Sequence, residues 1–68
     1  MRWEQVSGGW RQFREEVKEE WQRLSDKDLD AIAGEQEQLV GTIQKRYRIL
    51  REDAQDEVSE WLDRDDYA

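Results

Sequence analysis

Four carboxylates in the middle of the chain have the spacing of a calcium-binding loop. They occupy positions 1, 3, 5 and 12 of an EF-hand pattern: Asp26, Asp28, Asp30 and Glu37. The sixth position of such a loop requires glycine for its sharp turn, and here it is Ala31. The same stretch is also typical of a helix that begins after Ser25, which would aim these carboxylates in different directions. We therefore predict a charged first helical turn, with no metal and no other cofactor.

A second group of carboxylates has a spacing that suggests acid–base catalysis: Glu15, Glu16, Glu19 and Glu20. Such chemistry needs a pocket that separates the pKa values of two carboxyl groups, whereas these four fall on the polar flank of an amphipathic pattern. The chain contains no histidine and no cysteine, so imidazole bases and thiolate nucleophiles are excluded within it. We predict that the protein is not an enzyme and that none of its residues is catalytic.

Basic residues gather in one segment of the chain: Lys45, Arg46, Arg48 and Arg51. This cluster could contact a phosphate backbone or an acidic partner, but it also suits the negative end of a helix dipole. The chain has 18 acidic and 11 basic residues, and its net charge of −7 opposes binding to nucleic acid or anionic lipid. The cluster is therefore a weak candidate for an interaction patch.

Length and hydropathy place the chain among small helical proteins. Its 68 residues fit a single domain. No apolar run approaches the roughly 20 residues of a membrane span, and the N-terminal sequence lacks the apolar centre of a secretory signal. We expect a cytoplasmic protein without membrane contact. Four tryptophans, two tyrosines and one phenylalanine argue against disorder, although 43% of the residues are charged.

The apolar residues of the first third recur at helical spacing. Steps of three and four place seven of them within an arc of roughly 80° on a helical wheel: Trp3, Val6, Trp10, Phe13, Val17, Trp21 and Leu24. Gly8 and Gly9 interrupt this pattern, and Ser7 could cap a new helix near Gly8. We predict a short helix followed by a longer one, bent at the glycines. One continuous helix is the alternative, because the stripe stays in phase.

A third helix is predicted to begin after Ser25, whose side chain should cap it, with Asp28 three positions further on. Leu24 and Leu29 are placed to form a hydrophobic staple across this start. Gly34 is placed to end the helix in a left-handed conformation.

Two more helices are predicted, over about 35–48 and 50–62. Basic residues at 45–48 followed by acidic residues at 52–56 favour a break near Arg48 to Leu50. The apolar phase does not demand this break, since positions 39, 43, 47, 50, 54, 58 and 61 share one face. A long helix over 35–62, forming a two-helix hairpin that dimerises, is therefore an alternative. Residues 63–68 are predicted to fray.

These patterns predict an all-α fold, and the apolar residues that face inward should form its core. At its centre we expect Trp10, Phe13, Val17 and Trp21. Packed against them should be Leu24, Leu29, Ile32, Leu39, Ile43, Tyr47, Val58 and Trp61.

The combined spacing resembles the CsbD-like family of small bacterial general-stress-response proteins over nearly the whole chain. The matching residues are Gly8, Trp10, Gln12, Lys18, Trp21, Leu24, Ser25, Asp26, Asp28, Gly34, Glu37, Leu39, Gly41, Ile43, Gln44 and Tyr47. The resemblance implies one domain over 1–68, a compact bundle of four to five short helices in a SAM-like arrangement of orthogonal hairpins. It also implies induction by stress, and it supplies no catalytic residue. Where the family often has glycine and a capping residue, this chain has Arg48 and Leu50.

For function, we expect a non-enzymatic, acidic stress-response protein that acts as a protein-interaction module with an unidentified partner, as a monomer or weak dimer. The alternative is a highly soluble protectant that acts in bulk during drying or osmotic shock. Nucleic-acid contact through the basic cluster is the weakest hypothesis.

Overall fold

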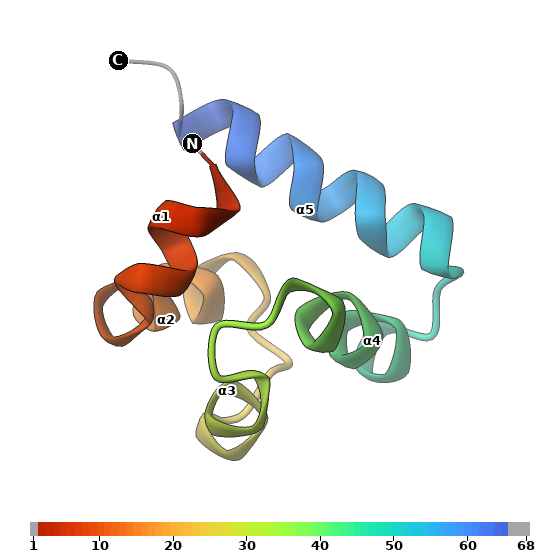
Figure 1. Cartoon of the computed structure of the whole chain (residues 1–68). Helices are drawn as coiled ribbons and strands as arrows, with labels where there is room; N and C mark the ends of the chain where they lie inside the picture. The colour runs from red at the N-terminus through yellow and green to blue at the C-terminus, as the bar shows by residue number, and fades with distance from the viewer. Residues whose placement is uncertain (1, 66–68) are drawn as a thin grey trace.

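The computed structural model describes residues 2–65, which form five helices joined by short turns (Figure 1). The helices are α1 (Trp3–Gly8), α2 (Trp10–Glu20), α3 (Asp26–Ile32), α4 (Gln36–Tyr47) and α5 (Arg51–Asp65). The predicted all-α bundle of short helices is confirmed. The alternative of one helix over 35–62 is wrong, because the chain leaves helical geometry between α4 and α5.

The helices pack as neighbours along the chain. Helix α1 lies against α2, and α4 lies against both α3 and α5 (Figure 1). Within residues 2–65, no helix is both long enough and apolar enough to cross a membrane.

Gly9 forms the corner between α1 and α2. Its amide donates a hydrogen bond to the carbonyl of Gln5, and its carbonyl accepts one from the amide of Phe13, both at 3.0 Å. A Cβ at this position would lie 3.3 Å from the ring of Phe13, so the glycine lets the ring pack against the backbone. The predicted helix start at Ser7 is wrong, because α1 continues through Gly8 and the chain turns one residue later.

Ser25 is the N-cap of α3. Its hydroxyl accepts a hydrogen bond from the amide of Asp28, and the carboxylate of Asp28 accepts one from the amide of Ser25, both at 3.1 Å. This reciprocal pair is a capping box, which satisfies two backbone amides that the helix itself cannot. Leu24 and Leu29, on either side of the cap, are both buried.

Helix α3 ends in two successive left-handed residues: Ala33, which is its C-cap and was not predicted, and the predicted Gly34. Ala33 has φ 49°, and Gly34 follows with φ 82°. Gly34 is needed at the next position because a Cβ there would lie 3.2 Å from the Ser7 hydroxyl oxygen of α1. The turn after α3 therefore serves as a close packing surface for the first helix.

The core comprises twelve buried apolar residues from all five helices and the turn between α2 and α3: Val6, Val17, Trp21, Leu24, Leu29, Ile32, Leu39, Val40, Ile43, Ala54, Val58 and Trp61. Trp10, Phe13 and Tyr47 are only half-buried and pack against the edge of this cluster. The prediction that Trp10 and Phe13 lie at its centre is therefore wrong. The Trp10 indole N–H reaches the Leu29 carbonyl at 3.2 Å, which holds this ring across the gap between α2 and α3.

The last helix is longer than predicted. Helix α5 continues to Asp65, three residues beyond the predicted end at 62; the predicted fraying of 63–68 stays a prediction, and 66–68 lie outside the described residues. A guanidinium nitrogen of Arg64 lies 2.7 Å from a carboxylate oxygen of Glu20, and this ion pair links the end of α5 to the end of α2.

Candidate interaction surface

The carboxylates with calcium-loop spacing point toward different cations. Asp26 accepts a hydrogen bond from the ammonium of Lys18 at 2.8 Å, and Asp30 accepts one from the guanidinium of Arg14 at 2.6 Å. The bonded Lys18 lowers the pKa of Asp26. In residues 2–65, no cluster of three or more possible ligand side chains is arranged to hold a metal ion. These carboxylates instead tie α3 to α2.

Asp28 binds a cation from α4. The guanidinium of Arg46 donates two hydrogen bonds to its carboxylate, at 2.7 and 2.9 Å. The bonds from Arg46, and then the bond from the amide of Ser25, lower the pKa of Asp28 from its usual 3.8 to about 2. The same pair raises the pKa of Arg46. Arg46 is thus already engaged in joining α4 to α3.

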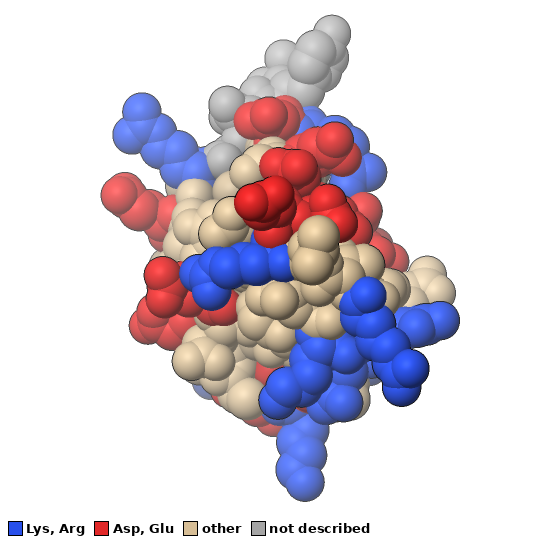
Figure 2. Space-filling model, turned by 90° about the vertical axis from the view of Figure 1, so that its right-hand side faces the viewer, with Lys and Arg blue, Asp and Glu red and all other residues tan. Residues whose placement is uncertain are grey.

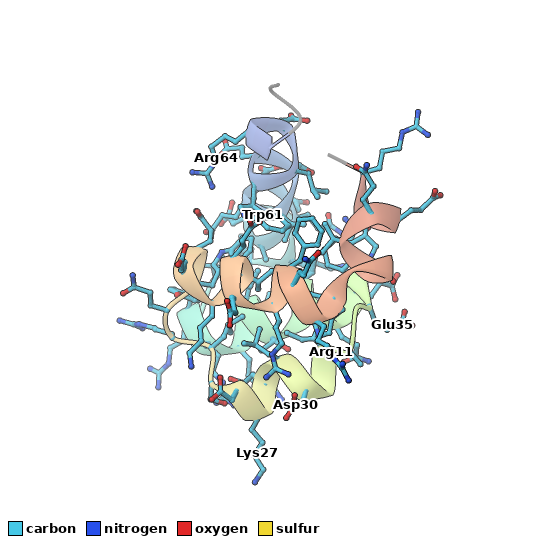
Figure 3. All side chains as sticks on the ribbon, turned by 90° about the vertical axis from the view of Figure 1, so that its left-hand side faces the viewer. Arg11, Lys27, Asp30, Glu35, Trp61 and Arg64 are labelled. Atoms are coloured by element: carbon cyan, nitrogen blue, oxygen red, sulfur yellow. The ribbon has the colours of Figure 1, made fainter. Side chains whose placement is uncertain are left out.

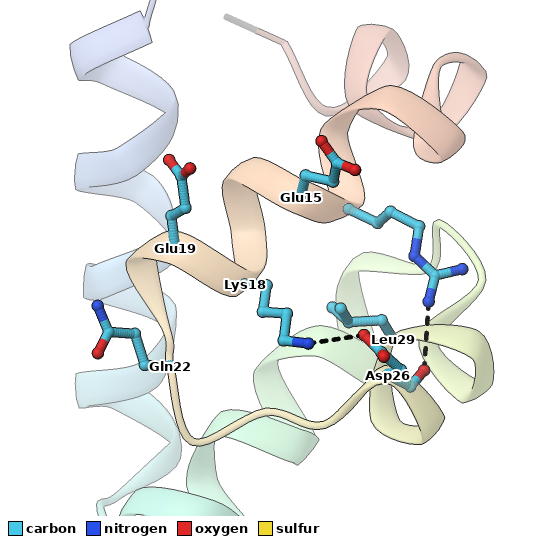
Figure 4. Close-up of a pocket in the computed structure, with 7 residues that line it drawn as sticks. Glu15, Lys18, Glu19, Gln22, Asp26 and Leu29 are labelled. Atoms are coloured by element: carbon cyan, nitrogen blue, oxygen red, sulfur yellow. Dashed lines mark hydrogen bonds and ion pairs between the residues drawn. The ribbon is translucent and has the colours of Figure 1, made fainter.

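A shallow hollow of about 440 Å³ lies between α2 and α3 (Figure 4). Its cations, Arg14 and Lys18, are the ones that bind Asp30 and Asp26. Glu15 and Glu19 also line it, and Figure 4 shows both pointing away from the pair of Lys18 and Asp26. The predicted role of these glutamates as a solvated flank matches their exposure.

Acidic residues of α2 also border a second hollow, of about 480 Å³, next to α5. Glu16 and Glu20 line it together with Trp61 and Arg64, two residues that Figure 3 shows on α5 behind α2. The carboxylate of Glu20 is paired with Arg64. Negative charge therefore prevails along this side of the molecule.

The turn between α4 and α5 carries the opposite charge and an exposed apolar side chain. We call it the basic corner and define it as Lys45, Arg48, Leu50 and Arg51. Among the large apolar residues of the described range, only Leu50 is exposed, at 70%. Figure 2 looks onto this end of the molecule and shows basic side chains gathered below and acidic ones above. Charge is thus segregated on this face.

The basic side chains of the corner are weakly engaged with the rest of the protein. Within residues 2–65, Lys45 and Arg48 form no ion pair. Arg51 lies 3.9 Å from a carboxylate oxygen of Glu37, and the two side chains are 55% and 89% exposed. An ion pair this long and this exposed contributes little. Of the four basic residues singled out in the sequence, only Arg46 has a strong partner.

Arg23, which was not predicted as part of an interaction patch, lies next to these residues. It lies in the turn between α2 and α3, and its guanidinium carbon is 5.4 Å from the centre of the Tyr47 ring at the end of α4. Its amide also donates a hydrogen bond to the Tyr47 hydroxyl at 3.1 Å. The turn therefore adds a cation beside the end of α4, held there by an aromatic ring.

Two residues of the corner are unfavourable for the stability of the fold, Arg48 by its backbone conformation and Leu50 by its place at a helix start. Arg48 has the left-handed conformation φ 53°, ψ 51°, which costs a residue with a side chain about 1–2 kcal/mol relative to a right-handed one. Leu50 is at the N-cap position of α5, since its carbonyl accepts the amide of Ala54 at 3.0 Å. A leucine side chain has no oxygen with which to cap a helix. A leucine at a predicted helix start is unusual, and this feature of the sequence could have identified Leu50 as a candidate functional residue.

Comparison with known proteins identifies relatives over almost the full chain. A UPF0337 protein of Pectobacterium atrosepticum is 47% identical over 64 residues, which cover 94% of this chain and 93% of the relative. The UPF0337 protein YjbJ of Escherichia coli K12 is 42% identical over 64 residues, with the same two shares. The chain belongs to the UPF0337 family. Another member, from Nitrosomonas europaea, is 44% identical over 59 residues, which cover 87% of this chain and 63% of that protein.

The UPF0337 relatives are bacterial, and their names state no reaction, ligand or partner. No protein-family model matches the chain. No solved structure matches it either.

Proposed function

We propose that this UPF0337 protein is a non-enzymatic, cytoplasmic stress-response protein that acts by binding another protein through its basic corner. The stress role is supported by the resemblance to the CsbD-like family. The binding role is supported by one observation above all: Leu50 is 70% exposed in a turn where both the backbone and the cap oppose stability.

A single exposed leucine is ordinary on a protein surface. Leu50 differs because it occupies a position where serine, threonine, aspartate or asparagine would stabilise α5. It also follows Arg48, where glycine would relieve the left-handed conformation. Positions that break local folding rules are concentrated at functional sites. This reasoning favours the corner over the α2–α3 hollow, whose charges satisfy one another.

The test is a set of cross-linked pull-downs from stressed cells with three baits: the native protein, Leu50→Ser and Arg11→Glu. Arg11 is exposed on α2, on the face shown in Figure 3, which is opposite to that of Figure 2. We expect one partner to be captured by the native protein and by Arg11→Glu, and lost with Leu50→Ser. Failure to enrich any specific partner across several stresses would remove the proposal.

A protectant acting in bulk is a second candidate, favoured by the net charge of −7 and the exposed carboxylates of α2 and α5. It predicts that the protein preserves unrelated enzymes through drying when it is present at high concentration. Leu50→Ser should not change this protection, whereas it should abolish partner capture. The same variant therefore separates the two functions.

A further inference from the structure

We infer that the segment captured by the basic corner is an acidic protein segment bearing a large apolar side chain, which packs on Leu50 while its carboxylates meet Lys45, Arg48 and Arg51. This inference rests on the proposed function and names the chemistry of the partner. It follows from the charge at the corner, the exposure of Leu50 and the poor fit of two other occupants.

The corner presents positive charge to a nearby ligand, although the net charge of the protein is negative. At physiological ionic strength, the Debye length is about 8 Å, so carboxylates on distant parts of the surface are largely screened from a ligand at the corner. The exposed Glu52 and Asp53 follow Arg51 directly in the first turn of α5, so a bound segment has to place its carboxylates on the side of the cations. Within the described residues, Lys45 and Arg48 form no ion pair, and the contact of Arg51 with Glu37 is 3.9 Å long. Incoming carboxylates would thus displace no strong internal pair.

Leu50 distinguishes a protein segment from a nucleic acid. Three cations suffice to hold a phosphate backbone, and an exposed leucine adds nothing to that contact. A nucleic acid would also extend past the corner toward the acidic side chains seen on the same face (Figure 2). A short peptide can place a few carboxylates on the cations and remain within the corner. An apolar side chain on it would cover Leu50 from water.

A second copy of this chain is a poor occupant of the corner. In a symmetric dimer the same surface of each copy would meet its counterpart. Contact between two Leu50 side chains would bring Lys45, Arg48 and Arg51 of both copies together. Like charges brought together in this way oppose association. The partner therefore has to bring the opposite charge together with its apolar group.

The probe is a phage-displayed library of random dodecapeptides, selected on the immobilised native protein. We expect enriched peptides to have an excess of aspartate and glutamate over basic residues and to contain at least one large apolar residue. Synthetic versions should then bind the native protein in a fluorescence polarisation assay, more weakly as salt is raised. Replacing their apolar residue by alanine should reduce affinity about tenfold, a typical effect of a central contact.

Three variants separate docking from folding. Leu50→Ser and Arg48→Glu should each lower peptide affinity about tenfold. Arg11→Glu, which makes the same charge change as Arg48→Glu but on α2, should alter affinity less than about twofold, because Arg11 is on the opposite face of the protein and charges far apart on a surface are screened by salt. Leu50→Ser should also raise the urea midpoint, because serine caps α5. Loss of binding in a more stable protein cannot be ascribed to unfolding.

Several results would overturn the inference. These are a lack of enrichment, enrichment of basic or uncharged peptides, or binding that Leu50→Ser leaves unchanged. Tight binding of a 20-base-pair DNA duplex that depends on Arg48 but not on Leu50 would assign the corner to nucleic acid. Self-association in sedimentation velocity that Leu50→Ser abolishes would assign it to a second copy.

The outcome also separates this inference from the proposed function. If a cellular partner is lost with Leu50→Ser but binds through a basic or neutral segment, the proposed function stands and the partner chemistry is wrong. If acidic peptides bind as expected but no cellular partner is found, the chemistry of the corner is right and the proposed function fails.

Discussion

The starts of α3 and α5 both have an aspartate three residues after the N-cap, but they differ in the N-cap residue itself. At α3, Ser25 is followed three residues later by Asp28, and the two side chains cap each other's backbone amides at 3.1 Å. At α5, Leu50 is followed three residues later by Asp53, and Leu50 contributes only its carbonyl, to Ala54. The first start is built to stabilise the fold. The second gives up that stabilisation and exposes an apolar group.

The C-terminal ends of α3 and α4 can be compared in the same way. Both α3 and α4 end in a left-handed residue that is not glycine, Ala33 and Arg48. The end of α3 is held from outside, because the indole N–H of Trp3 donates to the Gly34 carbonyl at 2.9 Å. Arg48 is exposed and forms no ion pair within the described chain. At the second turn the hydrogen bonds and the packing are local: the amide of Ile49 donates to the Gln44 carbonyl at 3.3 Å, and Ile49 packs against the core, while the Arg48 side chain is left in solvent.

The largest effect should come from the residue that anchors the turn into α3. Trp21 is 2% exposed, its ring centre lies 5.8 Å from that of Trp61, and its indole N–H donates to Glu57 at 2.9 Å. Trp21→Ala should lower the free energy of unfolding by about 3–5 kcal/mol. A urea melt followed by circular dichroism measures this change.

Trp21→Phe is the matched control, because it keeps an aromatic ring and loses the hydrogen bond to Glu57. It should destabilise clearly less than alanine. If both substitutions lowered the free energy of unfolding by the same small amount, Trp21 would not be the residue that anchors this turn.

Removing Asp28 from the capping box of α3 should have the next largest effect on the free energy of unfolding. Asp28→Ala deletes the acceptor for Ser25 and the two bonds from Arg46. We expect a loss of about 1–2 kcal/mol, toward the lower end because the Arg46 side chain is 47% exposed. Chemical denaturation at pH 7 provides the comparison, and an unchanged midpoint would contradict the contrast between the two helix starts.

The same carboxylate predicts a dependence on pH. The pKa of Asp28 in the folded protein is about 2, below its usual 3.8. A carboxyl group with a lowered pKa contributes stability that is complete above the unfolded pKa and is lost as pH falls through the folded pKa. The native protein should have a larger free energy of unfolding than Asp28→Asn at neutral pH. This difference should disappear as the pH falls from about 4 to about 2. A constant difference over that range would exclude this origin.

Leu50→Ser should make the two helix starts alike. It creates a second Ser-x-x-Asp sequence with Asp53 at the third helical position. The substitution should stabilise the protein by about 1 kcal/mol. Differential scanning calorimetry would detect the higher Tm, and Leu50→Ala, which provides no side-chain oxygen, should show no such gain.

Arg48→Gly should have the smallest effect. Glycine relieves the left-handed conformation, which costs about 1–2 kcal/mol, but it also adds entropy to the unfolded chain. The net gain should be about 0.5–1 kcal/mol. Arg48→Ala removes the same charge without relieving the backbone, so equal urea midpoints for the two variants would refute the conformational explanation.

The sequence predicted the helices well because their signals are local. The spacing of apolar residues in α2 and the residues Ser25 and Asp28 at the start of α3 depend only on near neighbours. The position of Leu50 depends on the break before it. In an unbroken helix Leu50 shares a face with Tyr47 and Ala54, whereas the left-handed turn at Arg48 rotates it out of that face and into solvent.

Other differences arise from contacts between distant segments. The turn after α3 has two left-handed residues, Ala33 and Gly34, and a Cβ at Gly34 would lie 3.2 Å from the hydroxyl oxygen of Ser7 in α1. Helix α5 extends past Leu62, where Arg64 meets Glu20 of α2. The basic cluster was predicted from the sequence. The ion pair with Asp28, which leaves Arg46 unavailable to a partner, was not. No periodicity within one helix can reveal which residue of another helix it will meet.

Three tryptophan side chains give the fold a set of separate spectroscopic reporters. The indole N–H of Trp3 bonds to Gly34, that of Trp10 to Leu29 and that of Trp21 to Glu57. Each bond spans a different pair of segments, and indole protons resonate apart from backbone amides in a nitrogen-edited NMR spectrum. Deuterium exchange at these three sites would therefore show whether α1, α2 and α5 open together or one at a time, without an attached probe.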